Sequence, residues 1–244
     1  MRESILIAGL EQSGKTYFSE KLADSYIKTG KTAIIYNVGK DSDFADALIC
    51  EPVSLETMFK HSRNRKDNLK IKVLNSLELF KDERTGKIYH FSNFRKLYAG
   101  KKVKIYRHQN ERYLIKAFFK YVYDSLLIFD DNRASTRQGL GHEQIELFSR
   151  KNHAGLKYAN GKQGLDLAFI YHNLDTVPGE LFDYITRAVL FSLNRVPNTK
   201  INNPEFWDII GEAINDLKTL PKYSYKELIL RGHPEIITKT YVNQ

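Results

Sequence analysis

Hydrophobic positions along the 244-residue chain fall into short, nearly continuous runs, separated by segments in which apolar residues follow a helical spacing. Such runs, rich in Ile, Leu, Val, Phe and Tyr, are typical of strands buried on both faces of a parallel sheet. The six runs are 4–8, 32–38, 102–106, 125–130, 165–171 and 187–193. The candidate helices are 13–30, 110–124, 137–153 and 177–185. This alternation predicts an α/β fold with a mainly parallel sheet flanked by helices.

Two stretches depart from this alternation. Residues 61–104 are dense in charge and contain aromatic side chains, so we expect an insert on the sheet. Its aromatic residues, in KIYHFSNFRKLY (87–98), are expected to form a small core of their own, with stacking on single-stranded bases as the alternative. Beyond Asn194, Pro204 and Glu205 open an amphipathic helix. We therefore predict one domain over 1–195 and a helical C-terminal tail over 196–244.

The first hydrophobic run leads directly into GLEQSGKT, residues 9–16, which matches G-x-x-x-x-G-K-[ST] at every fixed position. A predicted strand precedes it and a predicted helix follows it, which is the context that a phosphate-binding P-loop requires. Glycines let successive backbone N–H groups turn toward the β-phosphate at the positive end of the helix. The lysine would reach the β- and γ-phosphates. The residues expected to bind ATP are Gly9, Gln12, Ser13, Gly14, Lys15, Thr16 and Tyr17.

A second strand, in SLLIFDD (125–131), ends in two carboxylates and fits a Walker B pattern. We expect Asp130 to hold Mg²⁺ through water, together with the hydroxyl of Thr16. Asp131 would orient and deprotonate the attacking water. Its side chain is one methylene shorter than the Glu that most such motors use at this position. A helix cap is the alternative for the two acids.

Composition adds a nucleic-acid partner to this picture. The chain has 38 Lys and Arg against 29 Asp and Glu, a net charge of +9, which would attract a polyanion, although a basic surface also serves solubility. The single cysteine, Cys50, cannot form an intrachain disulfide, and the N-terminus does not resemble a secretory signal. With no apolar run long enough to span a bilayer, we expect an intracellular protein without a membrane span.

Residues 154–193, AGLKYANGKQGLDLAFIYHNLDTVPGELFDYITRAVLFSL, resemble the FtsK/HerA superfamily of DNA-pumping ATPases. The resemblance covers about residues 1–195 and implies a RecA-like core. In that family a strand after Walker B ends in a polar sensor, usually Gln. Here His172 takes this position, and Asn173 is the near alternative. A purely structural role for His172, as a cap at the end of the strand, is the other possibility. An arginine then reaches the neighbouring subunit's site. The resemblance implies Arg187 for this role, with Arg150 and Arg195 as rivals.

The near-minimal core looks most like the viral genome-packaging branch of this superfamily. That resemblance implies a homo-oligomeric ring that hydrolyses ATP with Mg²⁺ and translocates DNA, with double-stranded DNA as the expected partner. It also implies a place in the host cytoplasm or on the virion, with a capsid or vertex protein as partner. The residues expected to grip DNA phosphates are Arg133, Arg137, Lys151, Lys157 and Lys162.

Two other functions fit the same P-loop. The filamentous-phage assembly ATPases related to zonula occludens toxin are also similar, and an ATP-dependent assembly factor of that type would act on protein partners. A small-molecule phosphotransferase is the third possibility, but the sequence offers no recognisable lid or acceptor site. DNA-stimulated hydrolysis separates the first possibility from the other two.

Overall fold

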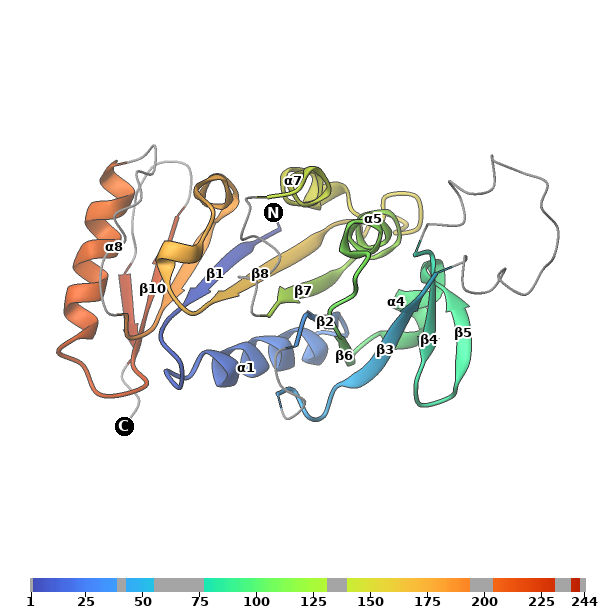
Figure 1. The fold of residues 1–244 in the computed structure, drawn as a ribbon, viewed down its shortest axis with the longest axis horizontal. Helices are drawn as coiled ribbons and strands as arrows, with labels where there is room; N and C mark the ends of the chain where they lie inside the picture. The colour runs from blue at the N-terminus through green and yellow to red at the C-terminus, as the bar shows by residue number, and fades with distance from the viewer. Residues whose placement is uncertain are drawn as a thin grey trace.

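The computed structural model describes residues 2–38, 43–54, 77–130, 140–193, 204–230 and 238–241. They form an 11-stranded mixed sheet with helices on both faces (Figure 1). The strand order is β11-β10-β9-β1-β8-β7-β2-β6-β3-β4-β5. The seven strands from β9 to β3 run parallel, and an antiparallel hairpin extends the sheet at each end. This confirms the predicted α/β fold with a mainly parallel sheet.

Each of the six predicted strands is present. They are β1 (Ser4–Ala8), β2 (Thr32–Tyr36), β6 (Lys102–Ile105), β7 (Ser125–Phe129), β8 (Leu165–Tyr171) and β9 (Arg187–Leu190). Every residue of β1, β2, β7 and β8 is buried, because helices cover both faces of the central sheet. Continuous burial explains why these strands read as unbroken apolar runs instead of alternating ones.

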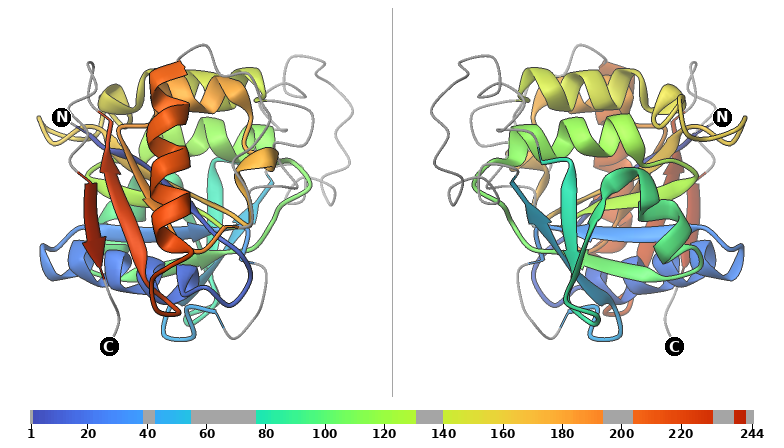
Figure 2. Two further views of the ribbon diagram at one scale, coloured as in Figure 1. Left: turned by 90° about the vertical axis from the view of Figure 1, so that its left-hand side faces the viewer. Right: turned by 90° about the vertical axis from the view of Figure 1, so that its right-hand side faces the viewer.

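One layer of helix lies on each face of the parallel strands (Figure 2). On one face, α1 (Lys15–Lys28) packs against a core that includes Ile5 and Ile7. On the other face lie α5 (Glu111–Tyr121) and α7 (His142–Ser149), which contact each other. The predicted helix at 177–185 is a 3-10 helix, Gly179–Tyr184, and two shorter 3-10 turns cover Lys151–His153 and Leu174–Thr176.

The charged insert builds the far end of the sheet. After β3 (Leu48–Val53), the strands β4 (Leu79–Asp82) and β5 (Lys87–His90) form an antiparallel hairpin, followed by a 3-10 turn (Phe91–Asn93) and α4 (Phe94–Tyr98). Phe80, Phe91, Phe94 and Tyr98 are buried against one another. These aromatic side chains are therefore buried, but they join the core beneath the central sheet, where Phe91 contacts Phe118, and do not form a separate core of the insert. The last part of the insert, β6, belongs to the parallel sheet.

The C-terminal tail contains the predicted helix, α8 (Pro204–Leu217), but it is only partly helical. Two further strands, β10 (Tyr225–Ile229) and β11 (Thr238–Tyr241), continue the sheet, and β10 pairs antiparallel with β9. The apolar side of α8 lies over this extension and buries Ile210 and Ile214. The description of the tail as helical thus misses the strands, whose alternating tyrosines and charges give a weak strand signal.

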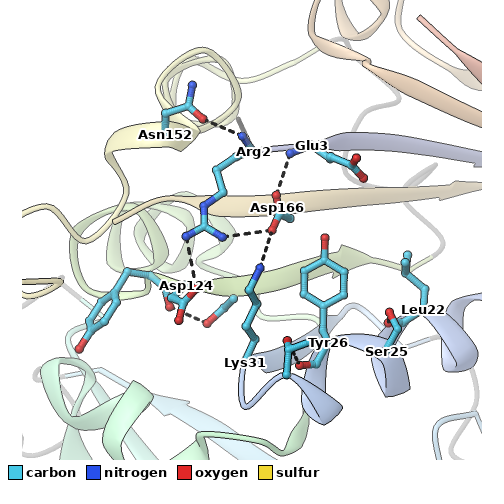
Figure 3. Close-up of polar contacts among 12 residues, drawn as sticks. Arg2, Glu3, Leu22, Ser25, Tyr26, Lys31, Asp124, Asn152 and Asp166 are labelled. Carbon is cyan, nitrogen blue, oxygen red and sulfur yellow. Dashed lines mark hydrogen bonds and ion pairs between the residues drawn. The ribbon is translucent and has the colours of Figure 1, made fainter. Parts of the chain in front are cut away.

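At the amino ends of the parallel strands, an ion network ties the start of β1 to its neighbours (Figure 3). The guanidinium of Arg2 lies 3.3 Å from a carboxylate oxygen of Asp124 and 3.3 Å from one of Asp166. Asp166 also accepts a 2.7 Å hydrogen bond from the backbone N–H of Glu3 and lies 3.7 Å from the ammonium of Lys31. The network therefore joins the starts of β1, β7, β8 and β2.

We predict that Asp166→Asn lowers the free energy of unfolding by about 3 kcal/mol, because it leaves two cations with a poorer partner in a site where the Asp166 residue is only 4% exposed. Chemical denaturation measured by circular dichroism checks this value. Asp183→Asn removes an exposed carboxylate outside the network and serves as the matched control. Equal midpoints for the two variants would contradict the prediction.

Candidate active site

The phosphate loop connects β1 to α1, as its sequence predicts. Gly14 has φ 101°, a left-handed conformation that favours glycine. Gly9 lies so close to β9 that a Cβ there would stand 2.5 Å from the Cβ of Phe191. A side chain at either position would therefore strain or displace the loop. The two glycines of the motif let the backbone turn tightly at the N-terminus of α1, where N–H groups favour an anion.

The ammonium of Lys15 folds back on the loop and donates to the carbonyl oxygens of Gly9, at 2.6 Å, and Leu10. The Lys15 residue is only 6% exposed. Burial lowers the pKa of Lys15 to about 8, against the opposing charges of Glu11 and Asp130. Carbonyl oxygens are neutral partners, so the loop holds this ammonium in place. Within the described part of the chain, its charge is compensated by the carboxylates of Glu11 and Asp130 at longer range. A bound polyphosphate would supply the missing negative charge.

The loop opens onto a cavity of about 600 Å³ at the carboxyl edge of the sheet. The lining residues are Glu11, Gln12, Ser13, Gly14, Lys15, Thr16, Tyr17, Asp43, Asp130, Ile170, His172 and Tyr223. This set brings together all but one of the residues predicted to bind nucleotide, and Gly9 lies behind them in the loop. Ser13 has a buried hydroxyl without a hydrogen-bond partner among the described residues. A polar cradle with an unsatisfied hydroxyl and a buried cation fits a phosphate ligand.

Asp130 and His172 reach this cavity because of the strand register. Ala8 pairs with Tyr171, so His172, directly after β8, lies beside the start of the phosphate loop. Phe129 pairs with Phe169, so Asp130, directly after β7, lies at the same edge. The carboxylate of Asp130 and the hydroxyl of Thr16 fit a Mg²⁺ site of the kind that uses one or two protein ligands together with phosphate oxygens. Asp131, predicted to orient water, lies outside the described residues.

The structure distinguishes His172 from its neighbour Asn173. The side-chain oxygen of Asn173 accepts a 3.0 Å hydrogen bond from the backbone N–H of Thr176 and caps the 3-10 turn there. His172 instead lines the phosphate cavity. The sensor position proposed from the sequence therefore fits His172 better than Asn173.

A second cavity, of about 560 Å³, adjoins the first and shares Gly14, Tyr17 and Tyr223 with it. Its remaining lining residues are Phe18, Lys21, Leu22, Arg187, Phe191 and Tyr225. The wall is mostly aromatic and aliphatic, which suits a flat ring better than a charged group. Among the residues that line this second cavity, Gly14 and Tyr17 were predicted from the sequence to bind nucleotide, and Arg187 was predicted to reach a neighbouring subunit's site. Tyr223 and Tyr225 belong to the tail and reach the site only because β10 pairs with β9.

Arg187 begins β9, at the amino end of the parallel strands. Its Nε lies 2.9 Å from a carboxylate oxygen of Glu227 on β10, and its Nη1 lies 3.6 Å from one of Glu3. The side chain is 24% exposed and lines the aromatic cavity of its own chain. Of its rivals, Arg150 is exposed beside Glu146 and over the ring of Phe119, and Arg195 lies outside the described residues.

The lysines predicted to grip DNA fall into two groups. Lys151 is buried, at 6% exposure, and donates to the hydroxyl of Ser4, and burial lowers its pKa to about 8. The prediction for Lys151 is therefore wrong, because an internal side chain cannot contact a phosphate backbone. Lys157 and Lys162 are exposed. They precede β8 and so lie at the amino edge, about 20 Å from the phosphate loop for a strand of this length. Arg133 and Arg137 lie outside the described residues.

Within the described part of the chain, no helix is both long enough and apolar enough to cross a membrane. The sequence matches no protein-family model and no curated protein. Its structure, in contrast, is similar to solved structures of one viral protein over nearly the whole length of both chains.

This viral protein is the genome-packaging NTPase B204, and three of its solved structures illustrate the likeness. B204 of Sulfolobus turreted icosahedral virus 2 in complex with sulfate has a TM-score of 0.62 and 15% identity, over 100% of this chain and 97% of the other. The same protein in complex with ATP-gammaS has a TM-score of 0.59 and 14% identity, over 98% and 96%. B204 from Sulfolobus turreted icosahedral virus, described as a DNA-packaging ATPase, has a TM-score of 0.52 and 15% identity, over 99% and 98%.

At this level of identity the likeness establishes the fold alone. As far as the fold is concerned, it confirms the resemblance proposed from the motifs, including the RecA-like arrangement of the sheet. The chain has the fold of a RecA-like P-loop NTPase, and it shares that fold with a viral genome-packaging NTPase.

Proposed function

We propose that this protein is an ATPase that couples hydrolysis to DNA translocation, as a genome-packaging motor of a virus. The observation that carries the proposal is the convergence of the phosphate loop, Asp130 and His172 on one cavity at the carboxyl edge of the sheet. The fold of the whole chain matches a protein whose solved complexes include ATP-gammaS and AMPPCP. A basic net charge of +9 agrees with a DNA partner.

In this proposal the loop N–H groups and Lys15 bind the phosphates, and the nucleobase enters the aromatic cavity beside Tyr17 and Phe191. Thr16 and Asp130 would hold Mg²⁺, which neutralises charge on the phosphate oxygens when it is bound. Asp131 orients the attacking water, and the imidazole of His172 hydrogen-bonds near the γ-phosphate. Lys157, Lys162, Arg133 and Arg137 are the cations proposed to contact DNA.

The rate of ATP hydrolysis, measured with double-stranded DNA, single-stranded DNA and no DNA, tests the proposal. We expect DNA to raise turnover several-fold at low salt, with less effect as salt increases, because phosphate contacts release counterions. Specific activity should also rise steeply with protein concentration if a ring completes the site. Turnover that ignores DNA and responds instead to a phage coat or membrane protein would favour the assembly-factor function.

The lowered pKa of Lys15 leads to a pH dependence of nucleotide binding. Because the pKa of this buried ammonium is about 8, raising the pH through 8 removes its proton and the charge that attracts phosphate. Affinity for ATP should therefore be nearly constant at pH 6.5–7.5 and weaken above pH 8, approaching tenfold per pH unit. Fluorescence titration with a labelled ATP analogue measures this, with circular dichroism confirming the fold at each pH. A flat profile to pH 9.5 would contradict it.

The proposed trans role of Arg187 predicts complementation between two inactive variants. Arg187→Ala should lower kcat by roughly 10³-fold while retaining ATP binding, the size of effect expected for an arginine finger. Lys15→Ala should lose hydrolysis through its own site. A mixture of the two variants should recover activity, because some sites then combine an intact Lys15 with a neighbour's intact Arg187.

If the mixture stays inactive while each variant still assembles with wild type, Arg187 acts within its own chain. That result would agree with its place in the aromatic cavity and its pairing with Glu227. Glu227→Gln removes the charge of the carboxylate that pairs with Arg187, and so tests the same ion pair from its other side.

A further inference from the structure

One carboxylate in the phosphate cavity belongs to neither the P-loop nor the Walker B strand. Asp43 lines this cavity together with Lys15, Asp130 and His172. It comes from the connection between β2 and β3, and β2 is the strand that pairs with β7 on the side away from β8. Asp43 thus approaches the phosphate site from the strand beyond the one that carries Asp130.

The backbone at Asp43 is fixed by a lysine from inside the sheet. Lys104, on β6, is only 3% exposed, and its ammonium donates a 2.9 Å hydrogen bond to the backbone carbonyl oxygen of Asp43. The next residue, Phe44, is fully buried with φ 51°, and its N–H donates to a carboxylate oxygen of Glu20 on α1 at 3.1 Å. A bulky residue in a left-handed conformation persists only where its surroundings hold it.

A second lysine of β6 fixes the same segment three residues further on. The ammonium of Lys102 lies 2.7 Å from a carboxylate oxygen of Asp46 and 2.7 Å from one of Asp24 on α1. Burial acts to lower the pKa of Lys102, but its hydrogen bonds to Asp24 and Asp46 outweigh burial and raise the pKa above its ordinary value. Residues 43–47 are therefore attached both to β6 and to α1, the helix that begins at the phosphate loop.

Lys102 and Lys104 are both largely buried on one strand of a parallel sheet, and burying lysine side chains is costly unless their ammonium groups have partners. A loop that only connected two strands would need neither of them. Here their contacts hold one short segment against the P-loop helix, with Asp43 in the wall of the phosphate cavity. Rigid support behind a carboxylate is what a group that orients a water molecule requires.

We propose that Asp43 is a catalytic residue that orients and deprotonates the water attacking the γ-phosphate, and that Lys104 is its positioning residue. The water oxygen bonds to the γ-phosphorus as the bond from that phosphorus to the β–γ bridging oxygen breaks. The water proton passes to the Asp43 carboxylate and from there to solvent, and ADP and phosphate leave. This inference rests on the proposed ATPase function. It assigns the removal of the water proton to Asp43 and leaves Asp131 the role of orienting the water.

Single-turnover and steady-state hydrolysis by Asp43→Asn test the proposal, with ATP binding measured in parallel. We expect kcat to fall at least about 10²-fold, as for loss of a general base, with the dissociation constant of ATP within twofold of wild type. Asp43→Glu should recover part of the rate. Asp208→Asn, an exposed carboxylate on α8, is the matched control and should behave as wild type.

Lys104→Met tests the positioning role separately. It should reduce kcat and leave ATP binding unchanged, and combining it with Asp43→Asn should cost little more than Asp43→Asn alone, because both changes act through one carboxylate. A purely structural lysine would instead give additive losses in the double variant, and that result would overturn the assignment of Lys104.

The outcomes for Asp43 are distinct from those for the proposed function. Wild-type protein that hydrolyses no ATP, with or without DNA, overturns both. If the wild type hydrolyses ATP and the rate of Asp43→Asn is within threefold of the wild-type rate, only the role of Asp43 is overturned. This conclusion does not depend on the rate of Asp131→Asn. Loss of ATP binding by Asp43→Asn also overturns it, because the residue would then act in binding and not in the chemical step.

Discussion

The parallel pairing of β1, β8, β7 and β2 is the constraint on which the rest of the molecule depends. Parallel strands in register must end at one edge, so the loops that follow them meet there. This pairing alone brings the phosphate loop, His172 and Asp130 around one cavity, although 163 positions separate Gly9 from His172 in the sequence. The amino ends of the same strands gather at the opposite edge, where Arg2, Asp124 and Asp166 form ion pairs.

Charged groups at the two edges of the sheet have different partners. At the amino edge, Arg2 and Lys31 face carboxylates, so the charges compensate one another within the chain. At the carboxyl edge, the ammonium of Lys15 donates hydrogen bonds to the neutral carbonyl oxygens of Gly9 and Leu10, and burial lowers its pKa. The first arrangement stabilises the fold, whereas the second keeps a cation ready for an anionic ligand.

Most of the central sheet and the phosphate site could be predicted from the sequence, because buried parallel strands and a P-loop both leave strong local patterns. The six strands and the loop residues were found in this way. The place of Asp43 could not be predicted from the sequence, because it depends on Lys104 and Lys102, which lie about 60 positions further along the chain. Lys151 was misassigned for a related reason: a lysine in a polar segment gives no local sign that it packs beside Ser4.

The tail illustrates the same limit. Tyr223 and Tyr225 are ordinary turn and strand residues by sequence, and only the antiparallel pairing of β10 with β9 brings them to the P-loop. The mixed tail of helix and strands also closes the apolar face near β9 with Ile210 and Ile214. Pairing between elements, and not the pattern within one, decides which residues line the site.

The position of β1 in the sheet has a consequence for biosynthesis. Both of its neighbours, β8 and β9, follow it by more than 150 positions, and Leu190 pairs with Ala8. At roughly 5–20 residues per second, the ribosome needs roughly ten to forty seconds to make the intervening segment. During that interval the first strand emerges without either partner, so the nascent chain holds a P-loop sequence but no P-loop.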